Sequence, residues 1–199
     1  MLYHILVPLA DQFGALNVFR YLTFRTGGAV ITALIVSFLF GPVIIEMLKS
    51  RQQGGQPIRE DGPESHLLTK KGTPTMGGLL ILIALGSATL LWSDLSNRFV
   101  WAALGVTMAF GLIGFLDDYM KVSKRDSNGM SSKMKFFMQV VIAALATFWI
   151  LQQMPPELAT KLAIPFLKST LLDLGWMFVV LAILVMVGAS NAVNLTDGL

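Results

Sequence analysis

The stretch FVWAALGVTMAFGLIGFLDDYMKVSK, residues 99–124, joins a long apolar run to two adjacent aspartates and two lysines. The run from Phe99 to Leu116 carries no charged residue. Its length approaches the roughly 20 residues with which a helix crosses a hydrocarbon core of about 30 Å. Asp117 and Asp118 follow the run directly, and Lys121 comes shortly after them. The pattern therefore predicts a transmembrane helix that ends in a pair of carboxylates.

The composition of the whole chain agrees with a membrane protein. Of its 199 residues, 54% are hydrophobic and 14% are charged, whereas a soluble domain usually has about 25% charged residues. Cysteine is absent from the sequence, which excludes disulfide bonds and thiolate metal sites within it. We therefore predict an all-α integral membrane protein in which residues 1–199 form one transmembrane domain.

Five apolar segments are predicted to be the transmembrane helices of this domain, at about residues 26–48, 76–92, 99–116, 136–151 and 175–193. Gly41–Pro42 predicts a kink in the first of them, because proline frees a backbone group that neighbouring groups must satisfy. The second and fourth segments are short, so they would cross nearly upright or with local thinning of the bilayer. The residues before the first segment lack the basic start of a signal peptide. We interpret them as an amphipathic segment at the membrane interface.

The distribution of lysine and arginine predicts the orientation of these segments. Most of these residues lie in two predicted loops, at about 49–75 and 117–135, and such an excess marks the cytoplasmic side. The N-terminus is therefore expected outside, and residues 152–173 are expected to form an outer loop with a short interfacial helix at about 157–164. The dense polar motifs then all lie at the cytoplasmic ends of the predicted helices.

The aspartate pair needs a compensating positive charge. Carboxylates at the C-terminal end of a helix oppose the helix dipole, and two adjacent anions repel each other. Either Mg²⁺ or Lys121 could supply the charge, since Mg²⁺ is commonly bound by one or two carboxylates together with substrate phosphates. Neighbouring helical residues point about 100° apart, so Asp117 and Asp118 would have different roles. The alternative is that the pair only marks the end of a helix in water.

A second group of polar residues lies in the last predicted helix and just after it. Asn194 and Asp197 are three residues apart and share a face if the last helix continues, with Asn191 one turn earlier. Polar side chains at the end of a span are costly unless they face the interior of a bundle or a cavity. This spacing indicates the lining of a site. The alternative is an ordinary helix end capped by Gly198.

The motif KKGTPTMGG, residues 70–78, predicts the start of a helix beside two lysines. Thr73 suits the N-cap position and Pro74 the first helical position. A helix N-terminus next to Lys70 and Lys71 would suit an anion. The alternative is a capped span whose lysine pair only sets the topology.

Together these clusters predict a site at the membrane edge with acidic residues on two spans and lysines around them. Such a set fits Mg²⁺-assisted phosphate chemistry between a lipid-borne group and a soluble phosphate compound. An ion-coupled membrane transporter is an alternative from another class, because intramembrane carboxylates also mark ion pathways. Transporter sites, however, usually lie near the middle of the bilayer. A membrane protein that only binds partners would not need two acidic clusters with matched lysines.

The motifs also resemble those of a known family. DGPESH with KKGTPTMGG, then GFLDDYMKV, then NAVNLTDGL are similar to motifs of the phospho-N-acetylmuramoyl-pentapeptide-transferases, within the superfamily of polyprenyl-phosphate N-acetylhexosamine-1-phosphate transferases. The resemblance implies transfer of phospho-MurNAc-pentapeptide from its UDP carrier to undecaprenyl phosphate. The products would be lipid I and UMP, in the first membrane step of peptidoglycan synthesis. Another polyprenyl-phosphate sugar-1-phosphate transferase is the alternative within the superfamily.

The same resemblance implies a role for each matching residue. Asp117, Asp118 and Asp197 match catalytic aspartates, of which one of the adjacent pair would help to activate the lipid phosphate. Asp117 and Asp118 would also be Mg²⁺ ligands, with the main ligand expected beyond residue 199. The substrate-binding positions implied in this way are Lys70, Thr75, Lys121, Lys133 and Asn194.

The resemblance further implies the setting of the reaction. The site would face the cytoplasm in the inner membrane of a bacterium, with Mg²⁺ as cofactor. The expected partners are UDP-MurNAc-pentapeptide, undecaprenyl phosphate, membrane lipid and a second copy in a homodimer, without nucleic acid. Members of the family have about ten spans, so the resemblance covers about half of such a protein. We therefore expect these 199 residues alone to lack transferase activity.

Overall fold

The computed structural model describes residues 1–52, 74–124, 129–166 and 171–196. These residues form two compact units, Met1–Met130 and Ser131–Leu199. Each unit is built mainly of apolar α-helices, as predicted. Of the described helices, three are long and apolar enough to cross a membrane, namely Leu22–Arg51, Arg98–Lys124 and Ser132–Leu151. Two shorter apolar helices, Gly78–Trp92 and Met177–Val193, accompany them.

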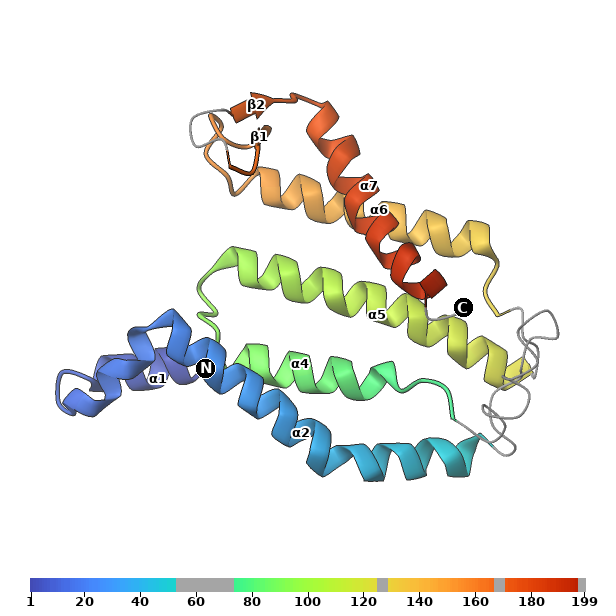
Figure 1. The fold of residues 1–199 in the computed structure, drawn as a ribbon, viewed down its shortest axis with the longest axis horizontal. Coiled ribbons are helices and arrows are strands. Elements are labelled where there is room, and N and C mark those ends of the chain that lie inside the picture. The colour runs from blue at the N-terminus through green and yellow to red at the C-terminus, as the bar shows by residue number, and fades with distance from the viewer. Residues whose placement is uncertain (53–73, 125–128, 167–170, 197–199) are drawn as a thin grey trace. The chain divides into compact units, whose positions relative to one another are not determined.

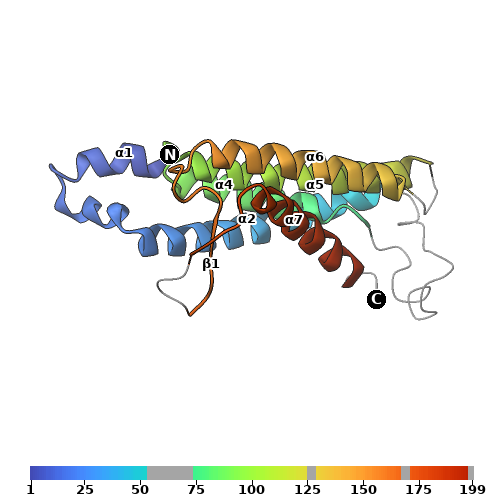
Figure 2. The same cartoon turned by 90° about the horizontal axis from the view of Figure 1, so that it is seen from above.

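The first unit contains α1 (Leu2–Leu9), the 3₁₀ helix η1 (Gly14–Arg20), α2 (Leu22–Arg51), α4 (Gly78–Trp92) and α5 (Arg98–Lys124). Figure 1 shows α4 between α2 and α5, and all three pack side by side. Figure 2 shows the chain leaving α1, reversing direction and returning through η1 into α2. The N-terminal segment, expected at the interface, is therefore folded back, with η1 in contact with α2 and α1 in contact with α4.

Small residues allow the helices of this unit to approach closely, which is common in membrane bundles. The buried residues of α4 are Ala84, Gly86 and Ala88. A Cβ atom on Gly28 of α2 would lie 2.4 Å from the ring of Trp92, so only glycine fits at this contact. The Trp92 indole N–H donates to Thr32 Oγ1 at 2.8 Å. The α2–α4 contact therefore combines close backbone approach with one satisfied polar group.

The second unit contains α6 (Ser132–Leu151), β1 (Lys161–Ala163), β2 (Leu171–Asp173) and α7 (Met177–Thr196). α6 packs against α7. The strands pair antiparallel with Leu162 opposite Leu172, between the end of α6 and the start of α7 (Figure 1). The expected interfacial helix at about 157–164 is therefore wrong. Pro165 disfavours helix in the residue before it, and β2 supplies a partner strand.

Two other sequence expectations about helix ends are corrected. α5 continues past Asp117 and Asp118 to Lys124, so the pair lies inside the helix, and part of the expected 117–135 loop is helical. α4 begins at Gly78 with Gly77 as its N-cap, so Pro74 is not at the first helical position. Thr73, the expected cap, lies outside the described residues.

The proline of α2 lies within a continuous helix. Pro42 is inside the 30-residue span of Leu22–Arg51, and Figure 1 shows α2 bending partway along its length. A proline lacks a backbone N–H and its ring presses on the preceding turn, so it bends a helix that neighbouring packing preserves. The predicted kink thus changes the direction of α2 without ending it.

Candidate functional site

The candidate site is built where three segments of the first unit meet. These are the C-terminal end of α2, the residues just before α4 and the last turns of α5. Hydrogen bonds join them in a chain from Gln52 to Thr75 and from Thr75 to Asp118. Because these links join residues 23 and 43 positions apart, the packing of the helices is what brings the groups together.

Asp117 is the more enclosed of the two adjacent carboxylates. The residue is 8% exposed, and both of its oxygens accept hydrogen bonds. Lys121 Nζ donates to Asp117 Oδ2 at 2.8 Å, one helical turn along α5. The backbone N–H of Met130 donates to Asp117 Oδ1 at 2.8 Å. A carboxylate held by a cation and a backbone donor has its charge compensated.

The turn that brings Met130 to this carboxylate depends on glycine. Gly129 has a φ of +60°, and a Cβ atom there would lie 2.5 Å from Asp117 Oδ1 and 2.7 Å from Lys121 Cε. Both the left-handed backbone and the close approach exclude an unstrained side chain at this position. The turn therefore fits closely over the Asp117–Lys121 ion pair.

Asp118 is more accessible and has different partners. Its side chain is 31% exposed, compared with 11% for Asp117. The Thr75 hydroxyl donates to Asp118 Oδ2 at 2.8 Å. Lys121 Nζ lies 3.5 Å from Asp118 Oδ1, a longer contact than the one it makes with Asp117. Lys121 thus bridges both carboxylates, and Asp118 keeps more room for a ligand.

This arrangement agrees with the prediction that Lys121 can compensate the aspartate pair. It differs from the prediction in the position of the aspartates, because both lie inside α5 and not at its end. Asp117 to Lys121 and Asp118 to Lys121 are spacings of four and three residues, at which helical side chains meet. The continued helix is therefore what gives one lysine access to both aspartates.

The donor set can be compared with the needs of Mg²⁺. Oxygen ligands suit this ion, and one or two carboxylates with substrate phosphates are sufficient. Asp118 Oδ1 is the carboxylate oxygen with the longer contact, and Asp117 would first have to exchange Lys121 or Met130 for the ion. Within the described residues, no group of three or more His, Cys, Asp or Glu is gathered. Asp118 would therefore fit as one ligand of a Mg²⁺ ion whose other ligands would include phosphate oxygens.

The other predicted residues are distributed differently. Lys70 and Asp197 lie outside the described residues, as does the side chain of Asn194. Lys133 is exposed in the first turn of α6 and belongs to the second unit. Of the predicted set, the structure therefore brings together Thr75, Asp117, Asp118 and Lys121.

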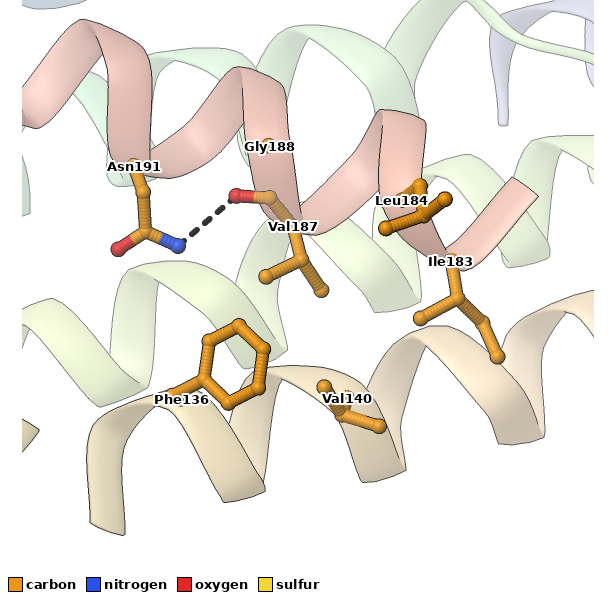
Figure 3. Close-up of a pocket in the computed structure, with 7 residues that line it drawn as sticks. All are labelled: Phe136, Val140, Ile183, Leu184, Val187, Gly188 and Asn191. Atoms are coloured by element: carbon orange, nitrogen blue, oxygen red, sulfur yellow. Dashed lines mark hydrogen bonds between the residues drawn. The ribbon is translucent and has the colours of Figure 1, made fainter. Parts of the chain in front are cut away.

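Asn191, one turn before Asn194, takes part in the packing of α6 and α7. Its amide donates to Gln139 Oε1 at 2.7 Å and to the Val187 carbonyl at 2.8 Å. It also lies at one end of a groove of about 240 Å³ between these helices, which is otherwise lined by apolar side chains such as Phe136 and Leu184 (Figure 3). This groove offers no charged group, in contrast to the Asp118 region.

Comparison with known proteins gives two matched segments, and both contribute residues to this site. The model of glycosyl transferase family 4 matches residues 100–199. The chain belongs to glycosyl transferase family 4. Signature 1 of phospho-N-acetylmuramoyl-pentapeptide-transferase matches residues 70–82. For this family 4 chain, the Thr75–Asp118 hydrogen bond joins the signature segment to the region of the family model.

One relative gives a more specific match than the family model does. A protein of Granulibacter bethesdensis named phospho-N-acetylmuramoyl-pentapeptide-transferase is 59% identical over 199 residues. The match covers all of this family 4 chain and 55% of that protein, so the chain spans about half the length of the relative. The resemblance seen in the sequence motifs is confirmed, and so is its extent.

Sequence reasoning missed three contributors to the site, namely Gln52, Gly129 and Met130. The Asn128–Gly129 pair was an available signal, since Asn-Gly marks tight turns. Met130 acts through its backbone N–H, which no side-chain motif reveals. Gln52 follows an apolar helix in a polar stretch of sequence, and nothing local distinguishes it from a solvated glutamine.

Proposed function

We propose that this chain forms part of an enzyme that transfers phospho-MurNAc-pentapeptide from UDP-MurNAc-pentapeptide to undecaprenyl phosphate. The products are lipid I and UMP. The observation that carries the proposal is the Asp118 carboxylate held by Thr75 at 2.8 Å beside Lys121. Family membership, the signature at residues 70–82 and the named relative support the same substrate class.

The net reaction exchanges one phosphorus–oxygen bond for another. An oxygen of the lipid phosphate bonds to the phosphorus that carries the sugar, and the bond from that phosphorus to the UMP oxygen breaks. UMP leaves with the electron pair of the broken bond. Little covalent chemistry is required of the protein, so positioning and charge compensation supply most of the catalysis.

The residues of the site provide these functions in different ways. Asp118 is the more exposed carboxylate, and it contacts either the lipid phosphate or the cation that is bound to that phosphate. Lys121 can turn from the carboxylates to a phosphate oxygen, because its ammonium is a mobile point charge on a flexible stem. Until a phosphate binds, Asp117 keeps Lys121 beside the site through a 2.8 Å ion pair. When bound, Mg²⁺ supplies charge neutralisation of the diphosphate, with Asp118 among its ligands.

The proposed setting is the bacterial inner membrane, with the site on the cytoplasmic side and the N-terminus outside. The lysines and arginines concentrated in residues 49–75 and 117–135 support this orientation. We propose a homodimer, as implied by the family resemblance. The site carboxylates lie near the C-terminal end of α5 and not at its middle, which favours the transferase over an ion-coupled transporter.

The decisive test measures UMP release from UDP-MurNAc-pentapeptide in membranes that contain the protein expressed from its complete gene, with undecaprenyl phosphate added. Asp118→Asn should lower turnover by at least about a hundredfold while leaving membrane insertion intact. Asp11→Asn is the matched control, since the Asp11 side chain is 83% exposed and forms a surface ion pair with Arg20, outside the residues of the proposed site. Unchanged turnover in Asp118→Asn would refute the assignment.

A second measurement asks whether residues 1–199 alone are active. The 199-residue chain expressed alone should release no UMP above background, because polar stripes on its spans need partner helices to enclose them. Robust turnover by these residues alone would contradict that expectation and would leave the assignment of Asp118 intact.

A further inference from the structure

Gln52 is a buried polar side chain beside the proposed site. The residue is 5% exposed and directly follows α2 as its C-cap. Its side-chain Oε1 accepts from the Thr75 backbone N–H at 2.9 Å, and its Nε2 donates to the Thr75 carbonyl at 3.1 Å. Both polar ends of the amide are thus satisfied by a single residue.

This two-point pairing fixes the backbone of Thr75 in position and in rotation. A single hydrogen bond leaves a residue free to pivot about it, whereas two bonds to its N–H and C=O remove that freedom. The pairing uses only backbone groups of Thr75, so the threonine hydroxyl remains available. That hydroxyl donates to Asp118 Oδ2 at 2.8 Å.

The backbone next to Thr75 needs such support. Met76 has a φ of +72°, a left-handed conformation that is unfavourable for a residue with a side chain. Conformations of this kind persist only when surrounding contacts enforce them. The Gln52 amide supplies two of these contacts at the adjacent residue.

Capping of α2 does not explain the Gln52 side chain. The cap bond comes from the backbone N–H of Gln52 to the Leu48 carbonyl at 2.9 Å. Any residue except proline offers that N–H. The side-chain amide is therefore directed to Thr75 and not to the helix end.

We propose that Gln52 is a positioning residue that acts on Asp118 through Thr75. By holding the Thr75 backbone, it aims the threonine hydroxyl at Asp118 Oδ2 and keeps that carboxylate oriented beside Lys121. The consequence for turnover rests on the proposed transferase function, whereas the hydrogen-bond link from Gln52 to Thr75 does not. In this proposal Gln52 acts through its hydrogen bonds to Thr75 and not through contact with substrate or metal.

The first readout is independent of activity. In Gln52→Met, amide hydrogen exchange in peptides that contain Thr75 should become at least about tenfold faster, because the N–H of Thr75 loses its acceptor. The matched control is Gln12→Met, at an exposed glutamine between α1 and η1. It should leave exchange at Thr75 unchanged. Unaltered exchange at Thr75 in Gln52→Met would overturn the proposal.

The second readout is steady-state kinetics of the protein expressed from its complete gene. Gln52→Met should lower kcat for UMP release by roughly tenfold to a hundredfold, with a smaller change in KM, since the loss concerns orientation of a reacting group. Thr75→Val should lower kcat similarly, and Thr75→Ser, which keeps the hydroxyl, should restore most of it. The double variant Gln52→Met with Thr75→Val should fall no further than Thr75→Val alone.

The outcomes separate the two proposals. If the unaltered protein releases no UMP, the transferase assignment fails while hydrogen exchange still tests the role of Gln52. If exchange at Thr75 accelerates but kcat is unchanged, or if the two variants combine additively, the positioning of Asp118 by Gln52 is refuted. Should Gln52→Met fail to accumulate, Gln52→Asn serves instead. It keeps a buried amide but is too short to reach both groups of Thr75, and the same results are expected from it.

Discussion

Replacing Gly129 with alanine is the sharpest structural test of the Asp117 environment. Gly129 adopts a φ of +60°, and the added Cβ would lie 2.5 Å from Asp117 Oδ1. The left-handed conformation costs alanine about 1 kcal/mol relative to glycine. The turn must also move away from the carboxylate, which sacrifices the Met130 N–H bond to Asp117, and a hydrogen bond to a charged group contributes about 2 kcal/mol.

These two effects together destabilise the local arrangement by about 3 kcal/mol, or roughly 150-fold in an equilibrium constant. The assay is hydrogen exchange of the Met130 amide, measured by mass spectrometry in nanodiscs. Its exchange in Gly129→Ala should be on the order of a hundredfold faster, because opening of the turn exposes this N–H to water. UMP release should fall as well, since Asp117, the ion-pair partner of Lys121, loses the backbone donor that holds its other oxygen.

Gly175 provides the matched control. It has a φ of +50°, and a Cβ atom there would meet nothing within 4 Å. Gly175→Ala therefore carries only the conformational cost of about 1 kcal/mol, which corresponds to roughly fivefold faster local exchange. If the Met130 amide in Gly129→Ala accelerates no more than the amide at position 175 in its own variant, the reasoning about contact with Asp117 is wrong.

Two further predictions concern the second unit. Replacing Asn191 with leucine should weaken the α6–α7 contact by roughly 0.5–2 kcal/mol, because Asn191 Nδ2 donates to Gln139 Oε1 at 2.7 Å. A double-mutant cycle with Gln139→Leu, read by thermal denaturation in detergent, should show coupling, and additive effects would contradict it. The backbone N–H of Gly175, and then the Thr160 hydroxyl, hold the pKa of Asp173 below its ordinary value of 3.8. The resulting stability is present above about pH 4 and lost as the pH falls through the lowered pKa, so hydrogen exchange of the β1–β2 amides, corrected for intrinsic rates, should accelerate at lower pH. Asp173→Asn should remove this pH dependence.

The helical segments show how far local sequence patterns reach. Apolar runs place both ends of α2, α4, α6 and α7 and the start of α5 to about four residues or better, because a membrane helix needs a long uncharged stretch. The end of an apolar run, however, is not the end of a helix. Favourable pairing of Asp117 with Lys121 at four residues' spacing lets α5 continue to Lys124. Hydropathy places the end of this helix before Asp117, because the charged residues interrupt the apolar run.

The strand pair β1 and β2 shows what local sequence patterns do not predict. Its register, with Lys161 opposite Asp173 and Ala163 opposite Leu171, depends on the pairing of residues that are 12 and 8 positions apart in the chain. Short strands carry little periodic signal, and the local pattern before Pro165 predicts a helix where β1 is found. Pairing between segments, which a local pattern does not contain, decided its conformation.

The amino-acid sequence by itself determined that this is an apolar, helical membrane protein with paired aspartates, neighbouring lysines and motifs of a lipid-linked sugar phosphate transferase. These properties are local, since they follow from composition, periodicity and short motifs. The tertiary structure alone decided that Thr75 donates to Asp118 and that the amide of Gln52 holds Thr75. Both contacts join segments that are distant in the chain, and they exist only because α4 packs between α2 and α5 and brings three helix ends together.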